Sequence, residues 1–394
     1  VCLQCHAAAK FNLSAHHKHE TGSPGASCVE CHMPETNYMV IDARRDHSMR
    51  VPRPDLSIKL GVPNACNRCH TEQTPGWAAE QMQAWYGEPN KDWQDFALVL
   101  QAARQGAPAA LPELERLIGS QQTPAIIRAT LLGEFSPYLS PASLSLLVDA
   151  LYEDDPLIRL SAIGTLAGAD PGLRRRLLFP FLDDPVRAVR LEAARILMDL
   201  PASQLNRQQQ AKLSQVLTAY AASFKVNADR PEAMLQLGVL HTAQGRLQAA
   251  EQVYRRAMDL DKHFSGAYVN LADLLSGQGQ EAQAMDVLQQ GLAVLPEDAG
   301  LHHALGLSLV RAKRYGQAVS ALAEAAIRAP ENARYAYVHA VALQSTGNIE
   351  QAIDTLEQAL RKHPHDRQIM AALVSYYRDS GDMDKATGMA ERLK

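Results

Sequence analysis

The sequence has little of several features that define common protein classes. It has no run of about 18 uncharged apolar residues, so no segment is predicted to span a membrane. Its formal net charge is only −4, which gives no bulk attraction for nucleic acid. Aromatic residues make up 6% of the chain, and this scarcity favours a helical array over a β-sandwich. The 394 residues, 46% of them apolar, are enough for two or three folded domains.

Cysteine is absent after residue 69, and the six cysteines before it form three pairs of one pattern. The motifs are Cys2-Leu3-Gln4-Cys5-His6, Cys28-Val29-Glu30-Cys31-His32 and Cys66-Asn67-Arg68-Cys69-His70. C-x-x-C-H is the attachment signature of haem c. Two thiols three positions apart reach the two vinyl groups on one porphyrin edge, and the following histidine gives the iron its proximal nitrogen. We therefore predict three haem c groups, bound through all six cysteines, with His6, His32 and His70 as proximal ligands.

Two other uses of paired cysteines were weighed against haem attachment. Zinc ribbons use C-x-x-C pairs, but they need an even number of pairs and no trailing histidine. A disulfide framework explains no histidine, and a two-residue gap closes only a small strained loop. Three motifs that use every cysteine therefore favour haem.

The second axial ligand of each iron is expected from the histidines between the motifs, for which a surface or packing role is the alternative. The candidates are His16, His17, His19 and His47. His16 and His19 are three apart, so on a helix they would share a face, while His47 is expected on a loop. Met33, Met39 and Met49 are alternative axial ligands. Two histidines per iron would leave no open position, which favours electron transfer over catalysis.

The segment 42–55 has arginines next to one candidate ligand. Arg44, Arg45, Arg50 and Arg53 are possible partners of haem propionates, because guanidinium groups bind carboxylates bidentately. Pairing with neighbouring aspartates in a solvated loop is an equal alternative. Pro52, Pro54 and Pro63 predict an extended strap rather than a helix. The first 70 residues can have little ordinary core, so the haems are expected to form it.

A repeat of 34 residues occupies the C-terminal half of the chain. Alanine recurs at this spacing, a large apolar residue follows four positions later, and a proline closes several repeats; the positions are Ala250, Ala284, Ala318, Ala352 and Ala386, then Tyr254, Leu288, Leu322 and Leu356, and Pro296, Pro330 and Pro364. Small residues at fixed places allow two antiparallel helices to approach closely. The pattern resembles tetratricopeptide repeats, in about five copies after a half-repeat at 207–226.

A looser repeat lies between residues 92 and 200. Thr123-Pro124, Asp155-Pro156 and Asp184-Pro185 each precede an arginine and small apolar residues, as at the start of a capped helix. This resembles HEAT repeats. We predict a mostly α-helical chain with three parts: a small haem-packed domain with its connector at 1–91, HEAT-like repeats at 92–205 and a tetratricopeptide solenoid at 206–394. The aromatic residues of the connector are expected to pack the joint or to cover the third haem; they are Trp77, Trp85, Tyr86 and Trp93.

The whole chain resembles bacterial multihaem cytochromes c that have a C-terminal tetratricopeptide solenoid. The resemblance depends on the three motifs, on His16-His17-Lys18-His19 and Asp46-His47-Ser48, and on Cys31-His32-Met33-Pro34 and Pro63-Asn64-Ala65-Cys66. In that family the histidines between motifs are expected to be distal ligands. The resemblance implies a non-enzymatic electron carrier whose solenoid docks redox partner proteins or other copies of itself, with an extracellular filament as one form.

Two other functions were considered. One is a periplasmic haem reductase of nitrogen or sulfur oxyanions, which needs one five-coordinate iron. The other is a tetratricopeptide adaptor with structural haems. No catalytic residues are assigned, and the seven histidines after residue 240 are expected at surface or groove positions. Haem attachment occurs after export, so a periplasmic or extracellular location is expected. The chain starts one residue before its first cysteine, which suggests a longer protein with a signal peptide, and further haems, upstream.

Overall fold

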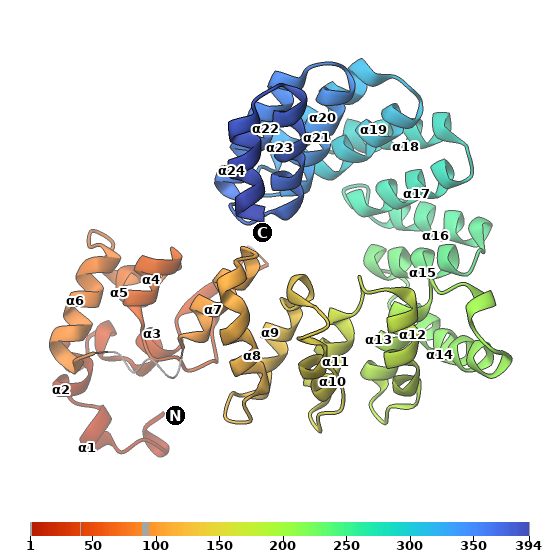
Figure 1. The fold of residues 1–394 in the computed structure, drawn as a ribbon. Helices are drawn as coiled ribbons and strands as arrows, with labels where there is room; N and C mark the ends of the chain where they lie inside the picture. The colour runs from red at the N-terminus through yellow and green to blue at the C-terminus, as the bar shows by residue number, and fades with distance from the viewer. Residues whose placement is uncertain (1, 40, 89–93, 394) are drawn as a thin grey trace. The chain divides into compact units, whose positions relative to one another are not determined.

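Helices make up about 70% of the structure, a computed structural model that describes residues 2–39, 41–88 and 94–393 (Figure 1). The prediction of a mostly α-helical fold is confirmed. The chain divides into two units, residues 1–101 and 102–394. The second unit contains both the looser repeats and the 34-residue repeats. In the described residues, no helix is both long enough and apolar enough to cross a lipid bilayer.

The first unit consists of short elements. A two-stranded antiparallel sheet, β1 with β2, pairs Glu35 with Arg45 and Tyr38 with Asp42. The strands are β1 (Glu35–Tyr38) and β2 (Asp42–Arg45), and the helices are α1 (Ala8–Phe11), α2 (Ser14–His17), α3 (Cys28–His32), α4 (Pro54–Leu60), α5 (Cys66–Cys69) and α6 (Pro75–Tyr86), with α7 (Phe96–Arg104) beginning here. Turns of 3-10 helix lie at Cys2–Gln4 and Pro24–Ala26.

This unit has almost no apolar core of its own. The buried residues in its described part are Pro54, Leu56, Ser57 and Ala78, all on α4 and α6. Ten large apolar side chains are exposed; they are Leu3, Leu13, Tyr38, Met39, Ile41, Met49, Val51, Ile58, Val62 and Tyr86. A unit of about 100 residues normally buries most of its apolar side chains. Residues 2–39, 41–88 and 94–101 therefore lack the apolar packing that stabilises an ordinary domain of this size.

The extended strap expected from three prolines is wrong for residues 54–60, where α4 forms. Pro54 is the first residue of this helix. At that position a backbone N–H has no partner within the helix, so proline removes nothing and its fixed φ suits the helix. Helix α4 ends at Gly61, and Pro63 follows its end. Pro54 thus lies at the start of the helix, and Pro63 lies in the chain just after its end.

The first part of the second unit is a series of helices with turn-like 3-10 segments between several of them. The helices are α8 (Leu111–Gly119), α9 (Ala125–Gly133), α10 (Leu144–Leu151), α11 (Pro156–Thr165), α12 (Pro171–Leu178), α13 (Arg187–Leu197) and α14 (Arg207–Lys225). Asp155 caps α11, and its side chain accepts a hydrogen bond from the Leu157 N–H, as its Asp-Pro sequence predicts. Asp184-Pro185 differs, because α13 begins only at Arg187.

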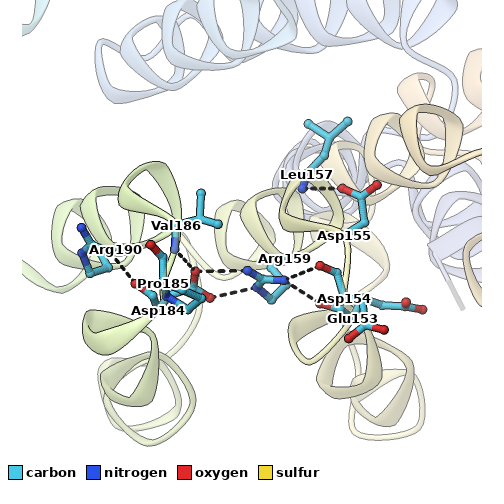
Figure 2. A network of polar contacts seen from close by, with 9 residues as sticks. All are labelled: Glu153, Asp154, Asp155, Leu157, Arg159, Asp184, Pro185, Val186 and Arg190. Carbon is cyan, nitrogen blue, oxygen red and sulfur yellow. Dashed lines mark hydrogen bonds and ion pairs between the residues drawn. The ribbon is translucent and has the colours of Figure 1, made fainter.

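Asp184 instead connects neighbouring repeats (Figure 2). Its carboxylate accepts hydrogen bonds from Arg159 Nε at 2.9 Å and from the Val186 N–H at 2.8 Å. Arg159 also donates to the carbonyls of Glu153 and Asp154. Arg190, 31 residues further along, repeats this pattern by donating to the carbonyls of Asp184 and Pro185. Arg159 therefore connects its repeat to the next one through Asp184, whereas these contacts of Arg190 lie within its own repeat.

The 34-residue repeats form five helix pairs, α15 to α24 (Figure 1). The first helices of the pairs begin at residues 231, 265, 299, 333 and 367, which confirms the period. The pairs are α15 (Pro231–Ala243) and α16 (Leu247–Leu260), α17 (Ser265–Gly277) and α18 (Glu281–Val294), α19 (Ala299–Arg311) and α20 (Tyr315–Arg328), α21 (Ala333–Ser345) and α22 (Ile349–Lys362), and α23 (Arg367–Asp379) and α24 (Met383–Leu393). The recurring alanines and the large apolar residues after them are all buried, as predicted.

The two helices of a pair approach closely at small residues. Gly306 on α19 faces Leu322 on α20, and a Cβ atom at Gly306 would lie 2.5 Å from Leu322 Cγ. Leu322 is fully buried, so neither helix has space to move away without leaving a cavity elsewhere. Glycine at this position sets the distance between the two helices.

We expect Gly306→Ala to lower the free energy of unfolding by about 1–3 kcal/mol, because the added methyl group overpacks the contact with Leu322. Gly316→Ala is the control, since no atom lies within 4 Å of a Cβ at Gly316. Alanine there should be neutral or stabilising by up to about 1 kcal/mol. Urea unfolding followed by circular dichroism measures both. Equal stabilities of the two variants would contradict the close approach.

We also expect Asp184→Ala to cost about 3–5 kcal/mol, because it leaves the Arg159 guanidinium buried and without its carboxylate. The two side chains are 11% and 5% exposed. The matched control is Glu251→Ala, which removes the acid of a pair on α16 whose arginine, Arg255, is 51% exposed. That change should cost less than about 1 kcal/mol. A loss for Asp184→Ala as small as the control's would show that the contact between repeats contributes little.

Candidate functional site

Each cysteine motif lies in a short helical turn. The second and third motifs form α3 and α5, and the first forms the 3-10 turn at Cys2–Gln4. Helical spacing places the two cysteines of a motif on one face of its turn. All six cysteines are free thiols, so the disulfide alternative has no support in the structure.

The second and third motifs lie next to each other. Burial raises the pKa of the Cys31 thiol, and the nearby Cys66 and Cys69 thiols raise it further. Tyr86 on α6 lies close to the same thiols. Burial raises the pKa of its hydroxyl, and the thiols of Cys31 and Cys66 raise it further. The structure therefore brings two of the three motifs to one location, which the sequence alone did not predict.

His16 faces the histidine of the second motif. The rings of His16 and His32 are nearly parallel, at an angle of 11°, and their centroids are 6.3 Å apart. His32 Nδ1 lies 2.9 Å from the backbone carbonyl oxygen of Arg50. A carbonyl oxygen only accepts, so Nδ1 carries the proton and the Nε2 lone pair is free. Burial lowers the pKa of His16, and the nearby His32 and His17 lower it further.

His19 faces the histidine of the third motif in the same way. The ring centroids of His19 and His70 are 6.1 Å apart, at an angle of 33°. His19 Nδ1 lies 2.5 Å from the carbonyl oxygen of His17, so this ring too has its Nε2 lone pair free. Trp77 packs on the other partner, with its ring centroid 5.0 Å from that of His70. Trp77 thus lies at the third motif, in the first unit.

Both separations suit two imidazoles that bind one metal ion from opposite sides. An imidazole nitrogen lies about 2 Å from a bound transition metal, and the ring centre is about 1 Å further away, so opposite ligands have centroids about 6 Å apart. Hydrogen bonding of the second ring nitrogen to a carbonyl is the usual support of such a ligand. The described residues contain no group of three or more His, Cys, Asp or Glu side chains that fits a metal ion, so they form no four-ligand zinc site.

The expected helical face shared by His16 and His19 is wrong. Helix α2 ends at His17, and Lys18 has a left-handed backbone conformation with φ of 57°. This residue turns the chain between the two histidines, so that each reaches a different partner. Four consecutive residues, 16–19, therefore supply one member of each pair.

The remaining histidines have different surroundings. His6 of the first motif packs edge-on against Phe11, whose other side meets His16; the ring centroids are 5.4 Å and 5.3 Å apart. His17 Nδ1 accepts from the His19 N–H, and among the described residues its buried Nε2 has no hydrogen-bond partner. His47 is exposed in the turn after β2, and no ring contact to it is found in the described part of the chain. The two pairs above thus involve His32 and His70 but not His6.

The candidate arginines bind groups of the protein itself. Arg45 pairs with Glu30 at 2.6 Å and with Glu35 at 3.2 Å. Arg44 pairs with Asp42 and lies over the Tyr38 ring. The Arg53 guanidinium, 8% exposed, pairs with Asp55 and Asp95, which raises its pKa, and Arg50 Nε donates to Ser48 Oγ. Arg44, Arg45 and Arg53 thus each have an acidic partner within the protein, and their role toward haem propionates stays a prediction.

Two contacts of the histidine pairs were not found by sequence reasoning. The Tyr86 hydroxyl donates a hydrogen bond to the carbonyl oxygen of His16, which fastens α6 to the segment 16–19. Gly25 lies directly against the His19 ring. The expected role of Trp93 falls outside the described residues. Among the histidines of the second unit, His241, His303 and His339 are half-buried, and burial lowers the pKa of each.

The comparisons with known proteins concern the helix pairs. Two family models described as tetratricopeptide repeat match the sequence, one at residues 206–262 and the other at 241–307 and 309–376. The C-terminal region is a tetratricopeptide repeat array. Such stacked repeats are scaffolds with extended binding surfaces for other proteins, and the expectation that the chain is not an enzyme fits this architecture. None of the curated proteins has a sequence that matches.

Solved structures similar to the tetratricopeptide array include three other proteins. MamA is 18% identical, with a TM-score of 0.36, over 40% of this chain and 92% of its own. YrrB, described as a TPR protein with an unusual peptide-binding site, is 17% identical, with a TM-score of 0.35, over 44% and 89%. PilF of Pseudomonas aeruginosa is 21% identical, with a TM-score of 0.37, over 41% and 74%.

Proposed function

We propose that the chain is a multihaem c-type cytochrome that transfers electrons and docks other proteins through its tetratricopeptide array. The observation that supports this best is the pair of histidine contacts, each of which joins the histidine of a C-x-x-C-H motif to a histidine outside the motifs at about 6 Å. The almost absent apolar core of residues 1–101 supports it too, since large apolar groups bound covalently would take the place of that core.

In this proposal the residues of the first unit have defined roles. Cys28 and Cys31 hold one haem and Cys66 and Cys69 another, while Cys2, Cys5 and His6 hold the third. His16 and His32 would hold one iron, and His19 and His70 the next. A bound haem supplies reversible one-electron exchange at its iron. Two imidazoles per iron leave no position for a substrate, so these residues favour electron transfer.

The array would bring the redox centres to their partners. Docking redox proteins or further copies of the chain fits an extended repeat surface, and a filament of copies is one form of this. Because haem attachment to C-x-x-C-H follows export, the proposal places the protein in the periplasm or outside the cell. Haem c in three copies is the cofactor that it requires.

The ligand assignment predicts the effect of His16→Ala. Removal of the imidazole opposite His32 would open one coordination position, so one more haem should bind carbon monoxide in the reduced variant than in the reduced unsubstituted protein. His263→Ala is the control, because the His263 side chain is 72% exposed in the second unit. Absorbance of the Soret band measures binding. No added carbon monoxide binding in His16→Ala, with covalent haem present in full amount, would contradict the pairing of His16 with His32.

A second candidate is a tetratricopeptide adaptor whose haems are structural. The family matches favour it, because they lie in the repeat array. A redox titration with mediators distinguishes the two functions. We expect every haem to be reduced and reoxidised reversibly, so that the total absorbance change corresponds to all the haems attached. Haems that exchange no electrons with any mediator would support the adaptor and contradict electron transfer.

A further inference from the structure

Gly25 lies directly beneath the imidazole of His19. It belongs to the 3-10 turn Pro24–Ala26, just before the second cysteine motif. A Cβ atom at residue 25 would lie 2.3 Å from His19 Cδ2, 2.6 Å from Cγ and 2.7 Å from Nε2. Its φ is outside the left-handed region, so the backbone conformation itself does not require glycine. What requires glycine is the close approach of the His19 ring, three atoms of which occupy the space that a Cβ atom would need.

The His19 ring is also held on its other sides. Its Nδ1 donates to the carbonyl oxygen of His17, the left-handed Lys18 fixes the chain direction before it, and His70 lies opposite. A side chain that is free at its far end would avoid a new methyl group by changing its rotamer, at a cost of about 1 kcal/mol. A ring whose Nε2 is bound to a metal cannot do so without breaking that bond.

We propose that Gly25 is a positioning residue for His19 as an axial ligand of the haem attached at Cys66 and Cys69. The inference rests on the proposed haem ligation and adds to it a residue that binds neither the iron nor the porphyrin. Gly25 acts by leaving the space in which the His19 imidazole stands opposite His70. Any side chain at position 25 displaces the ring and detaches its Nε2 from the iron.

The test compares Gly25→Ala with Gly76→Ala in the full chain carrying its haems. Gly76 is in the same unit, at the start of α6, and the nearest atom to a Cβ there is Thr74 Oγ1 at 3.5 Å. Haem content and mass establish that three groups are attached. Carbon monoxide is then added to the reduced proteins. We expect one more haem to bind it in Gly25→Ala than in the unsubstituted protein, and no change from the unsubstituted protein in Gly76→Ala.

Two further measurements separate positioning from loss of structure. Added imidazole should restore the low-spin spectrum of Gly25→Ala, because it replaces the detached ring. His19→Ala should show the same single carbon monoxide-binding haem, and the double variant His19→Ala/Gly25→Ala should match His19→Ala, since the methyl group then meets no ring. If Gly25→Ala alone does not fold, a folded double variant supports the inference, and a double variant that also fails overturns it.

The remaining outcomes are equally decisive. Three attached haems with unchanged carbon monoxide binding in Gly25→Ala would overturn the role of Gly25 while leaving the proposed function intact. A haem at Cys66 and Cys69 that already binds carbon monoxide in the unsubstituted protein would overturn the pairing of His19 with His70. If the unsubstituted protein takes up no covalent haem in an exporting host, the proposed function itself is overturned. The mass of the purified protein shows this before any variant is made.

Discussion

Two hydrogen bonds from imidazole rings to backbone carbonyls determine which ring nitrogens of the first unit are available to bind a metal ion. His32 donates through Nδ1 to Arg50, and His19 donates through Nδ1 to His17. Each bond fixes the tautomer of its ring and leaves the Nε2 lone pair available. Because only four residues are buried in the part of this unit that the structure describes, the packing of that part alone does not hold these rings in place. The proposed metal bonds and the covalent attachment of porphyrin would supply what the apolar core does not.

The repeats of the second unit were predictable because packing there is local and periodic. Each alanine of the 34-residue pattern meets a neighbour only a helix or two away, so its size is constrained in the same way in every copy. Asp184 shows where this reasoning fails. Its Asp-Pro sequence predicts a helix cap, but α13 starts later and the carboxylate binds Arg159 of the preceding repeat. A local pattern does not reveal that a buried cation needs the same carboxylate.

The candidate site also has a part that the local sequence predicts and a part that depends on tertiary structure. Each C-x-x-C-H motif consists of residues that are adjacent in the sequence, so the sequence alone indicates its chemistry and identifies its histidine. The pairing of His16 with His32 and of His19 with His70 depends on tertiary structure, and the helical spacing of 16 and 19 was misleading because Lys18 leaves the helix. Gly25 had no signal of its own, since a glycine that makes room for a ring looks like any glycine in a loop.

The segment 16–19 belongs to both histidine pairs at once, and Tyr86 holds its backbone from a third place. Only His17 and the left-handed Lys18 separate the two histidines, so a short stretch of backbone connects the two pairs. In the proposed function the two haem sites therefore share one four-residue segment. By thermodynamic reciprocity, any coupling that this segment transmits between them acts by the same factor in both directions.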